Sequence, residues 1–181
     1  MFTLPCIGMF YHDVAALLKN AKYVAVIHVK INPEFNIYLD KDENVVALEC
    51  LNADAKDAYG KKSFAGKTLD ETLQTVVSIA AEKGYMKEDQ MVALTITECT
   101  TDLDATELQM KMDSVVTEAA KEQDITVTTA MDMSEEVRMA QKEAGLIKQA
   151  CSNCNGTGDC PDCPVCGGSF KCVVCGGSST L

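Results

Sequence analysis

Apolar and polar residues alternate with a period of two in three short stretches near the start of the chain. The first stretch, YVAVIHVKI at 23–31, places a fully apolar set on one face: Ala25, Ile27, Val29 and Ile31. The second stretch, FNIYLD at 35–40, alternates in the same way, and the third, VVALEC at 45–50, follows the turn-forming segment KDEN. A period of two indicates β-strands. Three short strands in succession favour an antiparallel meander.

Helical patterns begin after residue 67. Thr68 and Glu71 form a capping-box pattern ahead of an apolar stripe with helical spacing, and Gly84 suits the position just after the helix. The remaining predicted elements are a strand at 91–98, a helix with its apolar stripe over 108–119, a strand at 125–131 and a helix from Ser134 to Gly145.

Strands mixed with helices predict an α/β fold of the α+β type. We expect a two-layer sandwich with a mostly antiparallel sheet and helices on one face. The chain divides into an N-terminal segment at 1–22, the α/β domain at 23–149 and a Cys-rich tail at 150–181. The Gly-rich tail has too few large apolar residues to build a core of its own, so it needs another source of stability.

The chain is acidic, because 16 Lys and Arg residues stand against 27 Asp and Glu residues, for a net charge of −11. This charge repels a phosphate backbone, so nucleic acid is not expected as a partner. No window approaches the roughly 20 apolar residues that a membrane helix needs, so this chain is predicted to contain no membrane segment, and its start lacks a secretion signal. A cytoplasmic location is expected, or an extracytoplasmic one if a membrane anchor precedes this sequence.

The tail contains most of the cysteines of the chain, in overlapping C-x-x-C pairs. Two C-x-x-C turns present four thiolates to one ion, which is the pattern of a tetrahedral zinc site. Disulfide or redox use is the alternative, but reduced thiols are typical of an unexported protein, and no strand-to-helix pattern surrounds the pairs. The predicted Zn²⁺ ligands are Cys151, Cys154, Cys160, Cys163, Cys166, Cys172 and Cys175.

Seven cysteines do not divide evenly into two four-cysteine sites. Either one zinc ion leaves some thiols spare, or two ions share a thiolate or recruit an Asp or His. The tail resembles the cysteine-rich zinc module of DnaJ-type chaperones, whose repeat C-x-x-C-x-G-x-G is matched in full by CSNCNGTG and in part by CPVCGG and CVVCGG. The resemblance implies a zinc ribbon with a protein-contact role. Metal binding would then supply the folding energy of the tail.

The larger domain carries a series of motifs in a fixed order. These are Asn32-Pro33 after the first strand, LNADAKDAYG from Leu51, GKTLDETL from Gly66, EKGYMKED from Glu82 and a closing EEVRMAQKEAGL. In this order they resemble the middle domain of RsgI-type bacterial anti-sigma factors, over roughly residues 22–147. The resemblance implies a domain outside the membrane in the parent proteins, whose sigma-binding segment and membrane helix precede it. This sequence contains neither segment, so it is not expected to be a complete anti-sigma factor.

The resemblance also implies self-cleavage between Asn32 and Pro33. The side-chain amide of Asn32 can attack its own backbone carbonyl, which closes a succinimide and expels the prolyl nitrogen. Pro33 is expected to restrict Asn32 to extended backbone geometry, and a tight turn there would store strain. The alternative is a simple turn between two strands, which both residues favour.

These observations predict a non-enzymatic regulatory protein that acts through contacts with a protein partner, with a zinc-stabilised C-terminal module. No Ser-His-Asp set, phosphate-binding Gly loop or paired-carboxylate motif is present. Two alternatives remain. The first is a self-processing protein that cuts once at Asn32-Pro33, and the second is a thiol-redox protein that uses the C-terminal C-x-x-C pairs.

Overall fold

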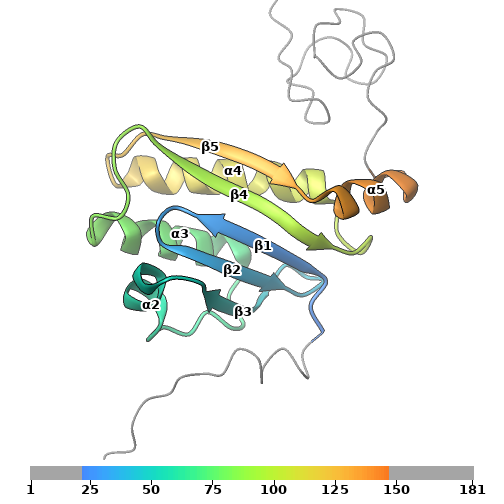
Figure 1. Ribbon diagram of the computed structural model, residues 1–181, viewed down its shortest axis with the longest axis horizontal. Coiled ribbons are helices and arrows are strands. Elements are labelled where there is room, and N and C mark those ends of the chain that lie inside the picture. Colours follow the sequence, from blue (N-terminus) through green and yellow to red (C-terminus); the bar gives the residue numbers. More distant parts are fainter. Residues whose placement is uncertain (1–21, 147–181) are drawn as a thin grey trace, which may run out of the picture.

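The computed structural model describes residues 22–146, and the predicted zinc ligands of the tail lie outside this range. The order of elements is β1 (Ala25–Lys30), β2 (Glu34–Leu39), β3 (Val45–Cys50), α2 (Ala53–Tyr59), α3 (Leu69–Glu82), β4 (Gln90–Cys99), α4 (Ala105–Glu122), β5 (Val127–Met133) and α5 (Glu135–Glu143). The strands form one five-stranded sheet in the order β3-β2-β1-β4-β5. Helices α3 and α4 lie behind this sheet in Figure 1. The predicted two-layer α/β fold is confirmed.

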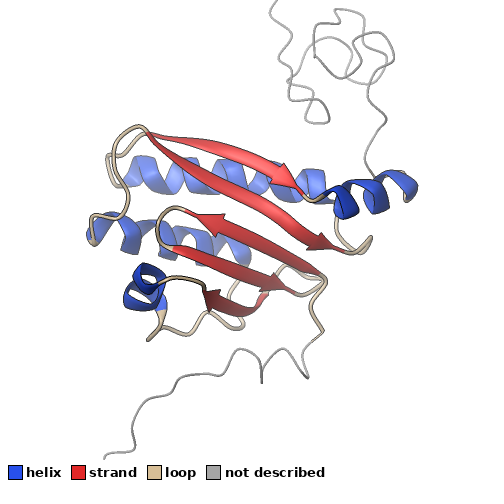
Figure 2. Cartoon of the chain, in the orientation of Figure 1, coloured by secondary structure: helices blue, strands red, loops and turns tan. Residues whose placement is uncertain are grey.

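The sheet is mostly antiparallel, as predicted. Strand β1 pairs antiparallel with both β2 and β4, and β2 pairs antiparallel with β3. Only β4 and β5 are parallel among the described strands, and α4 supplies the long connection that a parallel pair requires. The middle position of β1 puts the turn after Lys30 at one end of the sheet, between β2 and β4 (Figure 2).

Alternation along the strands separates the core from the open face. The apolar set of β1 is buried, from Ala25 to Ile31, and it joins the inward residues of β2 and β4 beneath α3 and α4. The side chains between them face away from the helices, and several are polar: His28, Lys30, Asn36, Tyr38 and Thr95. The side of the sheet opposite α3 and α4 is therefore a half-exposed polar surface, which we call the open face.

The helix boundaries follow local sequence signals. Thr68 and Glu71 form a reciprocal capping box at the start of α3, and Ser134 caps α5. Helix α2, which the sequence patterns did not predict, begins within LNADAKDAYG, where Asn52 caps it. Residues Ala55, Ala58 and Tyr59 of α2 recur at helical spacing and are buried. Within residues 22–146, no helix combines the length and the apolar character needed to cross a bilayer.

Candidate functional site

The turn between β1 and β2 consists of Ile31, Asn32 and Pro33, since Lys30 and Glu34 are the last paired residues. Asn32 has a φ of +66°, so the expected extended geometry was wrong. Left-handed backbone is uncommon outside glycine, and Asn tolerates it better than most residues. The Ile31 N–H donates to the Pro33 carbonyl at 2.9 Å, and this bond closes the turn around Asn32. The peptide bond from Asn32 to Pro33 therefore lies at the tip of a tight, left-handed turn.

Asn52 contacts this turn from the start of α2. Its Nδ2 donates to Asn32 Oδ1 at 3.4 Å. Its Oδ1 accepts from the backbone N–H of Ala55 at 2.8 Å, as a helix cap, and from that of Glu34 at 3.3 Å. One side chain thus contacts the residue before Pro33 and the residue after it.

Gln90 holds the turn from the β4 side. Its Oε1 accepts from the Lys87 N–H at 2.9 Å, and its Nε2 donates to the Ile31 carbonyl. The Lys87 loop belongs to the EKGYMKED motif. Three motifs that are far apart in the sequence therefore meet at Asn32, in the described part of the structure.

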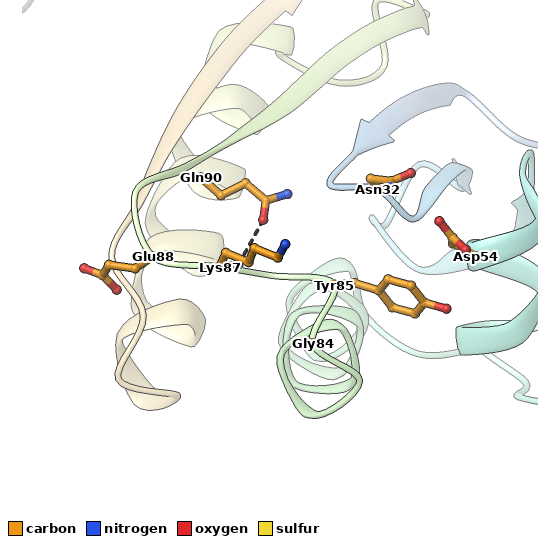
Figure 3. Close-up of a pocket in the computed structure, with 7 residues that line it drawn as sticks. All are labelled: Asn32, Asp54, Gly84, Tyr85, Lys87, Glu88 and Gln90. Carbon is orange, nitrogen blue, oxygen red and sulfur yellow. Dashed lines mark hydrogen bonds between the residues drawn. The ribbon is translucent and has the colours of Figure 1, made fainter.

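A cleft of about 480 Å³ opens beside Asn32. Figure 3 shows Asn32 near Asp54 of α2, with the Tyr85 ring below both of them and Gln90 on the β4 side. The other lining residues are Gly84, Lys87 and Glu88. All lining residues except Gly84 carry polar side-chain groups. Asn32 is exposed to solvent here, whereas Pro33 is buried.

Ion pairs and backbone contacts fix the walls of this cleft. Burial and the neighbouring Asp57 raise the pKa of the Tyr85 hydroxyl. Lys83 lies 2.7 Å from the Asp57 carboxylate and lowers the pKa of that group. The backbone N–H of Thr126 donates to Glu88 at 2.8 Å and lowers the pKa of Glu88. Asp57 and Glu88 therefore stay charged at neutral pH.

A second polar cluster lies on the open face beside the turn. His28 Nε2 is 3.0 Å from Glu34 Oε1. Further along β2, the Tyr38 hydroxyl donates to Glu49 at 2.8 Å, and Asn36 donates to the same carboxylate oxygen at 3.2 Å. Burial, together with the Glu49 carboxylate, raises the pKa of Tyr38 to about 12. The cluster keeps polar side chains ordered on a surface that no described element covers.

Asn32 and Pro33 were predicted as site residues from the sequence. Their neighbours Asn52, Gln90 and Glu34 were not predicted to contact them. Asn52 carried a detectable signal, because Asn before an Ala-rich segment with helical spacing is a helix-cap pattern. No local sequence pattern indicates the role of Gln90, since its contact with Ile31 depends on the pairing of β4 with β1. Across residues 22–146, no group of three His, Cys, Asp or Glu side chains is placed to hold a metal ion.

Residues 22–146 thus form an α/β domain with a left-handed Asn-Pro turn at one end of its sheet. Residues 24–151 of the chain match the family described as the anti-sigma factor RsgI-like central domain. Because this match covers most of the sequence, the chain belongs to that family, which confirms the resemblance found in the motifs.

Two curated relatives support this assignment. The chain is 31% identical over 75 residues to anti-sigma-I factor RsgI of Bacillus anthracis, an alignment that covers 41% of this chain and 17% of the relative. It is 33% identical over 66 residues to anti-sigma-I factor RsgI3 of Acetivibrio thermocellus, which covers 36% of this chain and 10% of the relative. The aligned segments are therefore a small part of the length of both relatives.

Proposed function

We propose that this chain is a non-enzymatic regulatory domain of the anti-sigma type that acts through contacts with a protein partner. The match of residues 24–151 to the anti-sigma central-domain family carries the proposal. The names of both relatives describe them as anti-sigma-I factors. We therefore propose that this chain takes part in the regulation of a sigma-I-type sigma factor. The open face supports the proposal, because it offers a broad polar surface without cover from a described helix.

A binding experiment with matched surface variants tests this function. Thr95 lies next to His28 in the centre of the open face, whereas Gln74 is exposed on α3. We expect Thr95→Arg to weaken retention of a protein partner on immobilised full-length chain by about tenfold, and Gln74→Arg to leave it unchanged. Full-length chain that retains no protein from its native host, including the sigma factors of that host, contradicts the proposal.

Single self-cleavage at Asn32-Pro33 is a second candidate function. The observation that favours it is the left-handed Asn32, with φ at +66°, held by a hydrogen bond from Asn52. Strained, over-determined backbone of this kind clusters at functional sites. Pro33 has no N–H, so its nitrogen cannot close the cyclic imide that leads to ordinary deamidation. Cyclisation by the Asn32 side chain is the reaction that remains.

Mass analysis of the purified chain tests self-cleavage. We expect two fragments that meet between residues 32 and 33, and we expect Asn32→Gly to remain intact, because glycine adopts the same positive φ but has no side-chain amide. An unbroken 19.5 kDa chain after days at neutral pH excludes the reaction. Equal cleavage of wild type and Asn32→Gly would assign the cut to a contaminating protease.

We further propose that the C-terminal tail binds Zn²⁺ through some or all of its seven cysteines. Support comes from the overlapping C-x-x-C spacing and the adjacent glycines alone. In this proposal the metal stabilises a small module that adds a second protein-contact surface to the domain.

A further inference from the structure

Asn52 is fixed in one orientation by two backbone donors. Its Oδ1 accepts from the N–H groups of Ala55, at 2.8 Å, and Glu34, at 3.3 Å. An amide oxygen accepts hydrogen bonds and an amide nitrogen donates them, so these two contacts place the oxygen of Asn52 and leave its Nδ2 to face Asn32. The helix cap of α2 thereby determines that the Nδ2 atom of Asn52, and not its Oδ1 atom, faces the Asn32 turn.

The same logic fixes the Asn32 side chain. Asn52 Nδ2 lies 3.4 Å from Asn32 Oδ1, and a donor at that position holds the oxygen, rather than the nitrogen, of Asn32 toward α2. The Asn32 Nδ2 is then the end of the amide that is left for reaction. Donation to Oδ1 also draws electron density from the amide, which makes the Nδ2 protons easier to lose.

We infer that Asn52 is a positioning residue for cleavage of the Asn32-Pro33 bond, an inference that rests on the self-cleavage proposed above. In the reaction, Asn32 Nδ2 attacks the backbone carbonyl carbon of Asn32 and forms a new C–N bond. The bond from that carbon to the Pro33 nitrogen breaks, and a proton lost from Nδ2 is transferred to the prolyl nitrogen. The products are a C-terminal succinimide at residue 32 and a free amino group at Pro33, and water later opens the succinimide.

Asn52 suits this role because it contacts both sides of the bond that breaks. Its contact with Asn32 orients the attacking side chain, and its contact with the Glu34 N–H anchors the leaving segment through the first residue of β2. Gln90 holds the preceding carbonyl, of Ile31, from the opposite side. The attacking and leaving groups are therefore held on a scaffold formed by α2 and β4, and orientation of this kind lowers the barrier of an intramolecular reaction.

The variant Asn52→Asp separates positioning from folding. A carboxylate still accepts the Ala55 and Glu34 N–H bonds, so the cap of α2 is retained, but it cannot donate to Asn32 Oδ1. We expect cleavage to slow by about tenfold or more, with a thermal midpoint close to that of wild type. Gln74→Glu is the matched control, since it makes the same amide-to-acid change at an exposed position on α3, and it should cleave at the wild-type rate.

The pH profile provides a readout that a purely structural role does not change. Protonation restores a donor at position 52, but the two backbone N–H bonds to this carboxylate lower its pKa. The ratio of the Asn52→Asp rate to the wild-type rate should therefore rise only as the pH falls below about 4. Asn52→Ser is the second variant if Asn52→Asp fails to fold, because Ser caps the helix but is too short to reach Asn32, and it should show the same loss of rate at all pH values.

Three outcomes contradict the inference. If wild type is not cleaved, both the self-cleavage function and the role of Asn52 are wrong. If wild type is cleaved and Asn52→Asp matches its rate, only the role of Asn52 is wrong. A slower Asn52→Asp variant with a rate ratio that does not depend on pH would also overturn it, since the defect would then be structural.

Discussion

The side-chain amide of Gln141 donates a hydrogen bond to the Leu103 carbonyl at 2.9 Å, from a position in α5 that is completely buried. The same Nε2 donates to the Thr100 carbonyl at 3.0 Å, and the Oε1 accepts from the Ala105 N–H at 3.2 Å. Gln141 therefore satisfies backbone groups of the β4-α4 loop that the packing of α5 removes from water.

Replacing this residue with an apolar one should destabilise the domain strongly. Gln141→Leu keeps much of the volume but leaves buried backbone groups without partners, and each such group costs about 1–3 kcal/mol. We expect a loss of about 3 kcal/mol in the free energy of unfolding, measured by urea denaturation of the full chain. Gln74→Leu, on the exposed side of α3, should change it by less than about 0.5 kcal/mol. Equal losses of unfolding free energy in Gln141→Leu and Gln74→Leu would show that the buried hydrogen bonds of Gln141 do not stabilise the domain.

The central position of β1 leads to a second prediction, which does not depend on whether the chain cuts itself. The strand pairs with β2 and β4 along its whole length, and its inward side chains are buried. Residues 1–32 and 33–181 produced as two separate chains should therefore associate into one folded domain. We expect co-elution in size-exclusion chromatography and separation only under denaturing conditions.

The variant Ile27→Asp provides the control for this association. Ile27 is fully buried, and an unpaired charge there costs far more than the strand pairing can offset. The fragment with Ile27→Asp should not bind residues 33–181. If the wild-type fragment also elutes separately, the strand pairing of β1 is too weak to hold the two parts together.

Elements with strong local signals could be predicted from the sequence alone. The capping box of Thr68 and Glu71 depends on residues three apart, and the alternation in β1 depends on neighbouring residues, so both follow from local sequence. Helix α2 was missed because its seven residues are too few to show a clear apolar stripe. Its stability comes from packing, including the edge-to-face contact of Tyr59 with Phe35, whose ring centroids are 5.1 Å apart.

Only part of the candidate site could be predicted from the sequence. Asn32-Pro33 stands out as a dipeptide, but the side chains that contact its turn, Asn52 and Gln90, are 20 and 59 residues away from the groups they hold. The expectation of extended backbone came from the local effect of proline. The left-handed turn combines a local bond, from the Ile31 N–H to the Pro33 carbonyl, with tertiary bonds from Asn52 and Gln90. A single sequence does not reveal which distant side chains supply the tertiary bonds.

Burial of Cys99 leads to a prediction about pH. Burial, followed by the nearby Asp104 and Asp102 carboxylates, raises the pKa of this thiol to about 11. Only the thiolate reacts with alkylating reagents, so Cys99 should be alkylated slowly at pH 8, about tenfold faster per pH unit above it, and rapidly once urea unfolds the chain. Peptide mapping after timed alkylation measures these rates. Fast native labelling at pH 8 would show that the thiol is accessible and ionised.

The same pKa shift predicts how Cys99 affects stability. The thiol in the unfolded chain has a pKa of about 8.5, below its value in the folded state. The unfolded chain therefore loses its proton first, and the folded state becomes less stable as the pH rises from about 8.5 to 11. In urea denaturation across that window, Cys99→Ala should show a weaker pH dependence than wild type, with the part due to Cys50 retained because burial also raises the pKa of that thiol. Removal of the buried Cys99 side chain also lowers stability at every pH.

The last prediction concerns the metal proposed for the tail. Zinc binding to a short cysteine-rich module is worth about 10–16 kcal/mol, so native mass spectrometry of the full chain should show one or two bound zinc ions. A chelator should remove them and make the tail thiols reactive, while residues 22–146 should keep their unfolding midpoint because their apolar core is built from their own side chains. Cys151→Ser with Cys154→Ser should lower the zinc content, and Cys50→Ser should not. Metal-free protein whose tail thiols are joined as disulfides would favour the thiol-redox alternative instead.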